Sequence, residues 1–187
     1  MSIRSENKNK KEKKRASLLA MILVIALLCG ATTVSAATKG KPGFATTSAK
    51  AFSDYMTAED YVFDYEGIYE NSNGKKEDHL DIVFEGDYLE DIEFNVYFDS
   101  DNEGAAFYIW DYVTFKPAQA QAVQDLCNRM NLQYRFCKFY VEDDNTVTVQ
   151  SDAIFFGNDI GEICECFICT TASIADEAYP EFEELLG

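Results

Sequence analysis

The sequence predicts an α+β domain, with an antiparallel five-stranded sheet and helices packed on one of its faces. Three observations predict this class: apolar and polar residues alternate over short runs, turn-forming residues separate those runs, and other segments repeat apolar residues at helical spacing. The expected order of elements is α-β-β-β-α-β-β-α. The predicted domain spans residues 48–187.

The first half of the domain is predicted to hold one helix and a meander of three strands. Residues 64–78 are polar and contain the turn signal Asn71-Ser-Asn-Gly74, so they are expected to connect the helix to the sheet. The clearest strand has Ile92, Phe94 and Phe98 on one side and Glu93 and Tyr97 on the other. The expected elements are a helix at 48–61 and strands at 80–85, 92–98 and 105–113.

The second half is predicted to hold two helices around a pair of strands. Lys116-Pro117 is expected to open the first helix, because proline is tolerated in a first turn. Apolar residues from Ile160 to Ala178 fall within one arc of a helical projection, and Pro180 is expected to end that helix. The expected elements are a helix after Lys116, strands at 134–141 and 146–150, and a helix at 158–179.

Charge is distributed unevenly along the chain. Residues 1–36 have a net charge of +5, whereas residues 37–187 have a net charge of −22, which gives the total of −17. Such an acidic surface repels nucleic-acid phosphates and anionic membranes, so no nucleic-acid partner is expected. It is compatible with a solvated surface, with weak cation binding or with a basic protein partner.

The N-terminal residues 1–36 have the three parts of a secretory signal peptide. A basic stretch precedes an apolar run at 16–29, and small residues follow, with cleavage expected between Ala36 and Ala37. Residues 37–47 are expected to form a flexible linker. The acidic domain is therefore predicted to be secreted or otherwise extracytoplasmic.

Two alternatives concern the fate of this segment. An uncleaved anchor over residues 16–34 would approach the roughly 20 apolar residues that cross a bilayer. Lipidation at Cys29 fits less well, because Leu28 stands where a small residue is expected. In each case the domain leaves the cytoplasm, since the basic end stays inside. Contact with the membrane is expected only through this segment.

Two phrases in the sequence resemble the YbjN family. The first is Leu126-Cys-Asn-Arg-Met-Asn131 followed by Tyr134-Arg-Phe-Cys-Lys-Phe-Tyr-Val141-Glu-Asp-Asp-Asn145, and the second is Asp176-Glu-Ala-Tyr-Pro180. The resemblance is strongest over residues 116–182 and extends from about Ser48. It implies a fold like that of the small dimeric chaperones of type III secretion, which hold segments of partners and catalyse nothing.

The resemblance implies no set of functional residues. The family's label as a sensory-transduction regulator implies an intracellular role, and the export segment departs from that setting. The phrases are expected to be structural: Asn128 and Asn131 close a helix, and the stripe 134–141 builds sheet.

No catalytic or metal chemistry is predicted. His79 is the only histidine and lies in a polar turn without an oriented partner, so a histidine-based nucleophile or zinc site is not expected. Asp99-x-Asp101-x-Glu103-Gly104 begins like a calcium loop, but Trp110 occupies the position of the bidentate glutamate, so a turn is expected. Phosphate-binding and dinucleotide motifs are absent, and no cofactor is expected.

Five cysteines follow the signal segment, and their redox state is open between buried thiols and disulfides. Cys166-Phe-Ile-Cys169 has the spacing of a redox motif, but it lies in the middle of a predicted helix, without the helix N-terminus that lowers a thiol pKa. No second pair is spaced for a zinc ribbon. The five are Cys127, Cys137, Cys164, Cys166 and Cys169.

A candidate partner surface lies on the third predicted strand. Tyr108, Trp110 and Tyr112 alternate with Phe107, Ile109 and Asp111, and this set faces outward if helices cover only one sheet face. The alternative is that these rings pack against neighbouring strands. The leading hypothesis is a non-catalytic, chaperone-like or adaptor-like binding module outside the cytoplasm, alone or as a homodimer, that takes a protein or peptide segment. The alternatives are an acidic structural or cell-surface protein and a thiol-redox protein using Cys166 and Cys169.

Overall fold

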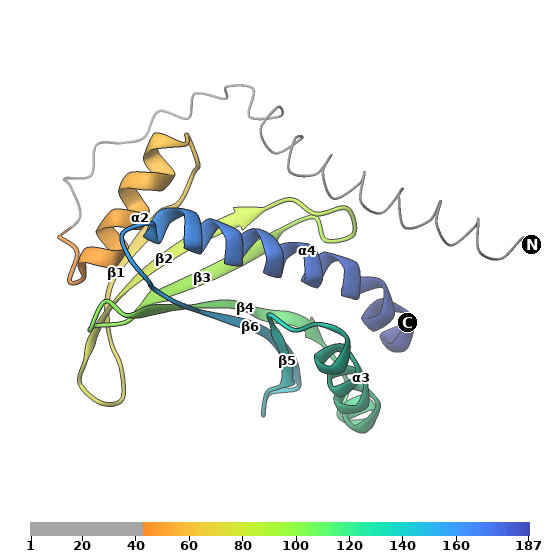
Figure 1. The fold of residues 1–187 in the computed structure, drawn as a ribbon. Helices are drawn as coiled ribbons and strands as arrows, with labels where there is room; N and C mark the ends of the chain where they lie inside the picture. Colours follow the sequence, from red (N-terminus) through yellow and green to blue (C-terminus); the bar gives the residue numbers. More distant parts are fainter. Residues whose placement is uncertain (1–42) are drawn as a thin grey trace, which may run out of the picture. The chain divides into compact units, whose positions relative to one another are not determined.

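A computed structural model describes residues 43–187, which form one antiparallel sheet with helices (Figure 1). The sheet has six strands in the order β1-β2-β3-β4-β6-β5. The elements are α2 (Thr47–Ala58), β1 (Asp64–Glu70), β2 (Lys76–Phe84), β3 (Ile92–Phe98), β4 (Gly104–Thr114), the 3-10 turn η1 (Pro117–Gln119), α3 (Ala120–Gln133), β5 (Lys138–Val141), β6 (Thr146–Ile154) and α4 (Ile160–Leu186).

The α+β class with an antiparallel sheet is confirmed, but the count of five strands is wrong. The additional strand is β1, at an edge of the sheet, where it pairs with β2 through a turn closed by the Asn71–Lys75 hydrogen bonds. Most side chains of β1 are exposed, so its sequence lacks the apolar alternation of a half-buried strand. The observed order of helices and strands over residues 43–187 is α-β-β-β-β-α-β-β-α.

Helices α2 and α4 pack on one face of the sheet. Figure 1 shows α2 and α4 on the same side of the strands, and the core fills the space between them. Inward residues such as Phe94, Val96 and Phe107 are fully buried, and each belongs to the apolar half of a strand alternation. Helix α3 packs against β5 and is linked to the end of α4, where Arg129 donates to Glu181.

The final helix is longer than predicted, since α4 continues through Pro180 to Leu186. Proline removes one backbone hydrogen bond of the helix, at a cost of about 3 kcal/mol. The turn that follows Pro180 is held by Phe182, which is fully buried and stacks on Phe139 at 5.8 Å between ring centroids. Burial of this ring offsets the lost bond, so the helix does not end there.

The last residues of the expected linker are fixed to the domain. Thr46 donates from its backbone N–H and its hydroxyl to the buried carboxylate of Asp78, at 2.7 and 2.6 Å. Ala45 donates to the other oxygen of Asp78 at 3.0 Å, and Thr46 caps the start of α2. A buried carboxylate thus orders the chain from Ala45 onward.

The predicted signal peptide, its cleavage site at Ala36 and Ala37, and the alternative anchor at 16–34 lie outside the described residues. Within residues 43–187, no helix combines the length and apolarity that a membrane span requires.

Candidate functional site

A row of aromatic side chains crosses the sheet face that none of the described helices covers. It comprises Tyr69 on β1, His79 on β2, Tyr97 on β3, and Tyr108 and Trp110 on β4, and is called the aromatic row below. His79 stacks on Tyr97 at 4.4 Å, and Tyr108 stacks on Trp110 at 4.3 Å between ring centroids. Edge contacts of Tyr97 with Tyr108 at 5.8 Å and with Tyr69 at 5.6 Å join these pairs, so the row is continuous over four strands.

The pairing register of the strands creates this row. His79 of β2 lies opposite Tyr97 of β3. Tyr108 of β4 lies opposite Asn95, which is the next residue of β3 on the same face as Tyr97. Side chains on this face come from the positions that alternate with the buried core residues. Trp110 is 40 % exposed and Tyr69 is 50 % exposed, so the row offers aromatic surface to solvent.

Carboxylates surround the aromatic row. Partial burial raises the pKa of Tyr97, with the negative charge of Asp81 as a further cause. Partial burial likewise raises the pKa of Tyr108, and the nearby charge of Asp152 adds to it. Both phenols therefore remain neutral donors at physiological pH, within a negative field.

The same field acts on the carboxylates themselves. Partial burial raises the pKa of Asp99, and repulsion from Asp101, Glu77 and Asp152 raises it further. His79 is the one basic group within the row, and its Nε2 lies 2.8 Å from Oδ1 of Asp81. The face is thus acidic at its centre as well as at its edges.

Tyr112 does not share this face, so the prediction that it lies beside Tyr108 and Trp110 is wrong. The pairing of β4 with β6 shifts between Ile109 and Val113, and Asp111 has a φ of 49°. Between these two positions β4 has two more residues than β6, so the strand bulges and its alternation is interrupted there, and Val113 again faces the core as Ile109 does. Tyr112 consequently points into the core, where it is 7 % exposed and donates its hydroxyl to the carbonyl of Ala175 at 2.7 Å.

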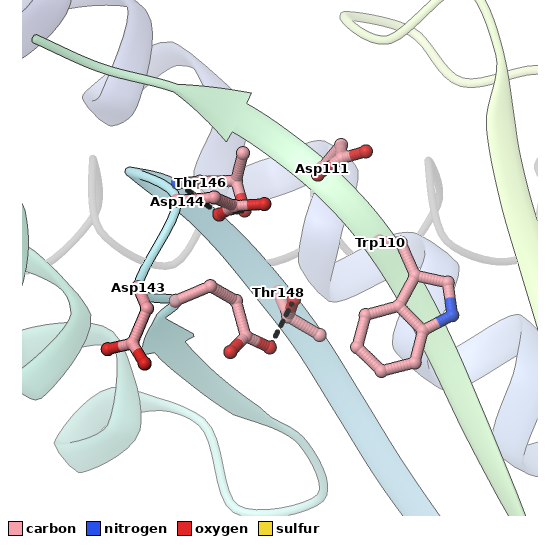
Figure 2. A pocket seen from close by; sticks show the side chains of 7 residues that line it. Trp110, Asp111, Asp143, Asp144, Thr146 and Thr148 are labelled. Atoms are coloured by element: carbon pink, nitrogen blue, oxygen red, sulfur yellow. Dashed lines mark hydrogen bonds between the residues drawn. The ribbon is translucent and has the colours of Figure 1, made fainter.

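A hollow of about 310 Å³ opens at the Trp110 end of the aromatic row. Figure 2 shows the indole of Trp110 on one side of it and Asp143 and Asp144 on the other. It lies between the bulge of β4 and the turn that joins β5 to β6. This acidic hollow is lined by Trp110, Asp111, Glu142, Asp143, Asp144, Thr146 and Thr148.

Two of the four carboxylates in the acidic hollow have structural partners. Asp144 accepts from the N–H and the hydroxyl of Thr146, and Glu142 accepts from the hydroxyl of Thr148 at 3.1 Å. Asp111 and Asp143 are exposed and make no side-chain hydrogen bond to any described residue. Among residues 43–187, no group of three or more His, Cys, Asp or Glu side chains is arranged to hold a metal ion.

The aspartate-rich phrase at residues 99–104 forms the predicted turn between strands. Asn102 donates its N–H to the carbonyl of Asp99 at 2.9 Å, and Asp99 donates to the carbonyl of Gly104 at 3.0 Å. The side chain of Asn102 accepts from the backbone N–H groups of Thr47 and Ser48, which start α2. The turn therefore binds a helix end of its own chain.

The five cysteines of the described region are free thiols, and three of them are buried. Burial raises the pKa of Cys127 to about 11 and that of Cys137 to about 12, and it also raises the pKa of Cys164. Burial, with the charge of Glu165 as a lesser cause, raises the pKa of Cys169 to about 11. Cys166 is exposed. A raised pKa leaves little thiolate at neutral pH, which does not favour redox chemistry.

Asn131 has a different role from the predicted helix closure. Its side-chain amide donates to the carbonyl of Phe139, and its carbonyl accepts from the N–H of Phe139, both at 2.8 Å. These bonds resemble a strand pairing and join α3 to the edge strand β5. Asp176, in the second family-like phrase, is 3 % exposed and accepts from the N–H groups of Asp87, Tyr88 and Leu89.

Residues 48–184 match the model of a family described as "YbjN: Putative bacterial sensory transduction regulator". The chain belongs to the YbjN family. A solved structure similar to this YbjN-family chain is described as "Crystal structure of YbjN, a putative transcription regulator from E. coli". The two sequences are 12 % identical, the match covers 71 % of this chain and 92 % of the other, and the TM-score is 0.46. No curated protein matches the sequence.

The sequence prediction found only part of the outward surface of this YbjN-family domain. It identified Tyr108 and Trp110 but not Tyr69, because β1 was not expected to be a strand. Tyr97 was placed on the outward side of its strand, but only the strand order shows that it adjoins Tyr108. His79 was expected in a solvent-facing turn, whereas it lies within β2 and stacks on Tyr97.

Proposed function

We propose that this chain is a non-catalytic binding module of the YbjN family that acts outside the cytoplasm and holds a peptide segment of a protein partner. The observation that carries the proposal is the aromatic row on the uncovered sheet face. Tyrosine and tryptophan side chains supply much of the energy at protein interfaces, because large rings lose little conformational entropy when they are covered. The role is chaperone-like or adaptor-like.

The composition of the open face supports binding over general solubility. On an outward strand face that serves only to keep a protein soluble, charged and small polar side chains are sufficient. Here four neighbouring strands each contribute a ring to one contiguous patch, although the domain has many acidic residues elsewhere. Contiguous exposed aromatic surface of this kind is typical of interaction sites.

The extracytoplasmic location is supported by the N-terminal sequence pattern of residues 1–36. Mass spectrometry of the protein recovered from envelope and culture fluid tests it. A mature N-terminus at Ala37 is the expected result. An intact N-terminus on protein found in the cytosol would overturn this part of the proposal.

The binding role is tested with a phage-displayed library of random twelve-residue peptides, panned on the full chain. Selected peptides are then labelled, and their affinity is measured by fluorescence anisotropy. Trp110→Ala is expected to weaken binding at least tenfold, because central aromatic contacts dominate interface energy. The matched control is Phe136→Ala, which removes a ring that is 61 % exposed but lies outside the aromatic row.

The outcomes separate the proposal from its main alternative. If panning selects no peptide, or if binding is unaffected by Trp110→Ala, the face is not a binding site. An acidic structural or cell-surface protein predicts that result. Equal losses for Trp110→Ala and Phe136→Ala would also contradict the proposal, since they would place binding elsewhere or reflect general damage.

A further inference from the structure

The charge around the aromatic row restricts the chemistry of its partner. Residues 43–187 contain 31 acidic and seven basic side chains. On the open face, Asp81 and Asp152 lie close enough to the row tyrosines to raise their pKa, and Glu77 and Asp99 also face Tyr108. An anionic segment placed here would be repelled along the whole row, whereas a cationic segment would be attracted.

The end of the row has the groups that bind an organic cation. The indole face of Trp110 attracts a cation positioned over it, and tryptophan is the best aromatic ring for this contact. The carboxylates of Asp111 and Asp143 lie in the same hollow, without described hydrogen-bond partners, and can accept N–H donors. A planar guanidinium stacks on a ring and donates to carboxylates at its edges at the same time, which a lysine ammonium cannot do.

The structure assigns to the aromatic row and the acidic hollow a shared occupant: an extended, positively charged peptide segment of a protein partner, with an arginine side chain inserted into the hollow beside Trp110. This assignment rests on the proposed function and specifies the partner's chemistry. The peptide lies across the strands on the face opposite α4. Its other side chains cover the rings of Tyr69, Tyr97 and Tyr108.

The dimensions of the face set the length of the segment. From β1 to β4 the row crosses three spacings between strands, which is about 14 Å at roughly 4.8 Å each. An extended chain covers that distance with about four to five residues. A segment of eight residues therefore spans the row and reaches the hollow. A volume of 310 Å³ is at the small end for ligand pockets and suits a single side chain.

A second copy of this chain is a poorer occupant of the same face. Two copies that paired through it would bring the carboxylates of both faces together, and like charges placed across an interface cost several kcal/mol. Few basic residues could compensate, because the described region has seven; of these, Lys138 pairs with Gln150 of this face and Lys75 lies near Asp99. Charge complementarity therefore favours a basic partner.

The test uses three labelled eight-residue peptides and the full chain. One has arginine at alternate positions, the second has citrulline in place of each arginine, and the third has glutamate there. Citrulline keeps the shape of arginine but lacks its charge. Affinity is measured by fluorescence anisotropy at 50 and 500 mM NaCl, and the emission of Trp110, the only tryptophan, reports whether the peptide reaches the hollow.

The arginine peptide is expected to bind at least tenfold more tightly than the citrulline peptide, and the glutamate peptide is expected not to bind. At 500 mM NaCl the ratio of affinities between the arginine and citrulline peptides is expected to fall at least threefold, because salt screens the attraction between arginine and the carboxylates. The double substitution Asp111→Asn and Asp143→Asn is expected to weaken arginine-peptide binding about fivefold. Asparagine tolerates the positive φ at position 111, so the fold is kept.

The control removes the same charge elsewhere, through Glu183→Gln and Glu184→Gln, which are exposed near the end of α4. An equal effect of both double variants would show a general field rather than a site and would overturn the assignment. Equal binding of the arginine and citrulline peptides would overturn the cationic partner but leave the proposed function intact. Selection of Trp110-dependent library peptides without an excess of arginine or lysine would likewise overturn the cationic partner and leave the proposed function intact.

Two further results would overturn the assignment in other ways. If no library peptide and no defined peptide binds, the proposed function fails together with it. If sedimentation velocity shows a dimer that Trp110→Ala dissociates, a second copy occupies the face. A monomer that binds the arginine peptide with a change in Trp110 emission supports the assignment.

Discussion

The buried carboxylate of Asp176 on α4 is predicted to fix the loop between β2 and β3. Its side chain accepts hydrogen bonds from three consecutive backbone N–H groups, those of Asp87 at 3.0 Å, Tyr88 at 2.9 Å and Leu89 at 2.9 Å. Gly86 completes the arrangement, because a Cβ at that position would lie 2.2 Å from Oδ1 of Asp176. Replacing Asp176 by alanine removes the acceptor of all three bonds.

The size of the effect follows from these contacts. A hydrogen bond with a charged partner contributes roughly 1.5 to 3 kcal/mol, and an amide that can reach water regains part of that loss. Asp87 and Tyr88 are exposed, so their amides can rehydrate after the substitution. We expect Asp176→Ala to lower the free energy of unfolding by about 3 kcal/mol. Asp176→Asn keeps one acceptor oxygen but turns an N–H₂ group towards the Asp87 amide. We expect this variant to lower the free energy of unfolding by about 1.5 kcal/mol.

Urea unfolding followed by Trp110 fluorescence measures both variants, and hydrogen exchange of the loop amides localises the change. The matched control is Glu177→Gln, at the neighbouring exposed position, for which a change below about 0.5 kcal/mol is expected. Gly86→Ala perturbs the same contact from the loop side and should accelerate exchange of the same amides. If Asp176→Ala stayed within about 0.5 kcal/mol of the parent chain, the loop would not depend on this carboxylate.

Three further predictions test the core, the thiols and the acidic field. Tyr112→Phe is expected to cost about 1 kcal/mol in urea unfolding, because it removes the buried bond to Ala175, and no cost would mean that this hydroxyl finds no partner in the core. Iodoacetamide at pH 7 is expected to label Cys166 first and Cys164 only on unfolding, as counted by mass spectrometry; rapid labelling of Cys164 would contradict its burial. Asp99→Asn is expected to raise stability at pH 7 by roughly 0.3 kcal/mol at low salt. The raised pKa of Asp99 means that the folded state binds its proton more readily, so stability falls as pH rises through the carboxylate range. Asp99→Asn is therefore expected to make the dependence of unfolding free energy on pH flatter than in the parent chain, and an unchanged dependence would refute this.

The core of the fold could be predicted because its strands alternate in a simple way. Phe94, Val96 and Phe98 recur at every second position, and all three are fully buried. The helical spacing around Cys164 and Ile168 likewise placed both residues in the core. These elements are stabilised mainly by burial of apolar side chains, and the spacing of apolar residues in the sequence predicts which side chains are buried.

The features that the sequence did not reveal depend on neighbours that lie far apart in the chain. Strand β1 is stabilised by pairing with β2, so its exposed residues show no alternation. The bulge at Asp111 uses a non-glycine residue at positive φ, for which no turn signal stands in the sequence, and it redirects Tyr112. Helix α4 passes Pro180 because Phe182 packs against Phe139 from another strand.

The candidate site was predictable residue by residue but not as a surface. The outward positions of each strand follow from alternation, yet which strands adjoin is decided by the order β1-β2-β3-β4-β6-β5. That order brings Tyr97 and Tyr108 into contact and places the turn after β5 beside Trp110. Neither contact is a property of any short segment of the chain.

The arrangement of charge and aromatic rings favours the proposed binding role over that of a merely acidic surface. If acidity served solubility alone, the outward positions of the central strands would not need large rings, since exposed rings lower solubility. In this chain Tyr97 and Tyr108 occupy central strands, and the exposed Trp110 ends the row at four carboxylates. Carboxylates beside these rings keep the face hydrated and disfavour pairing between two copies. They do so without reducing the attraction of the rings for a cation, and for this reason we propose a basic partner rather than a second copy of the chain.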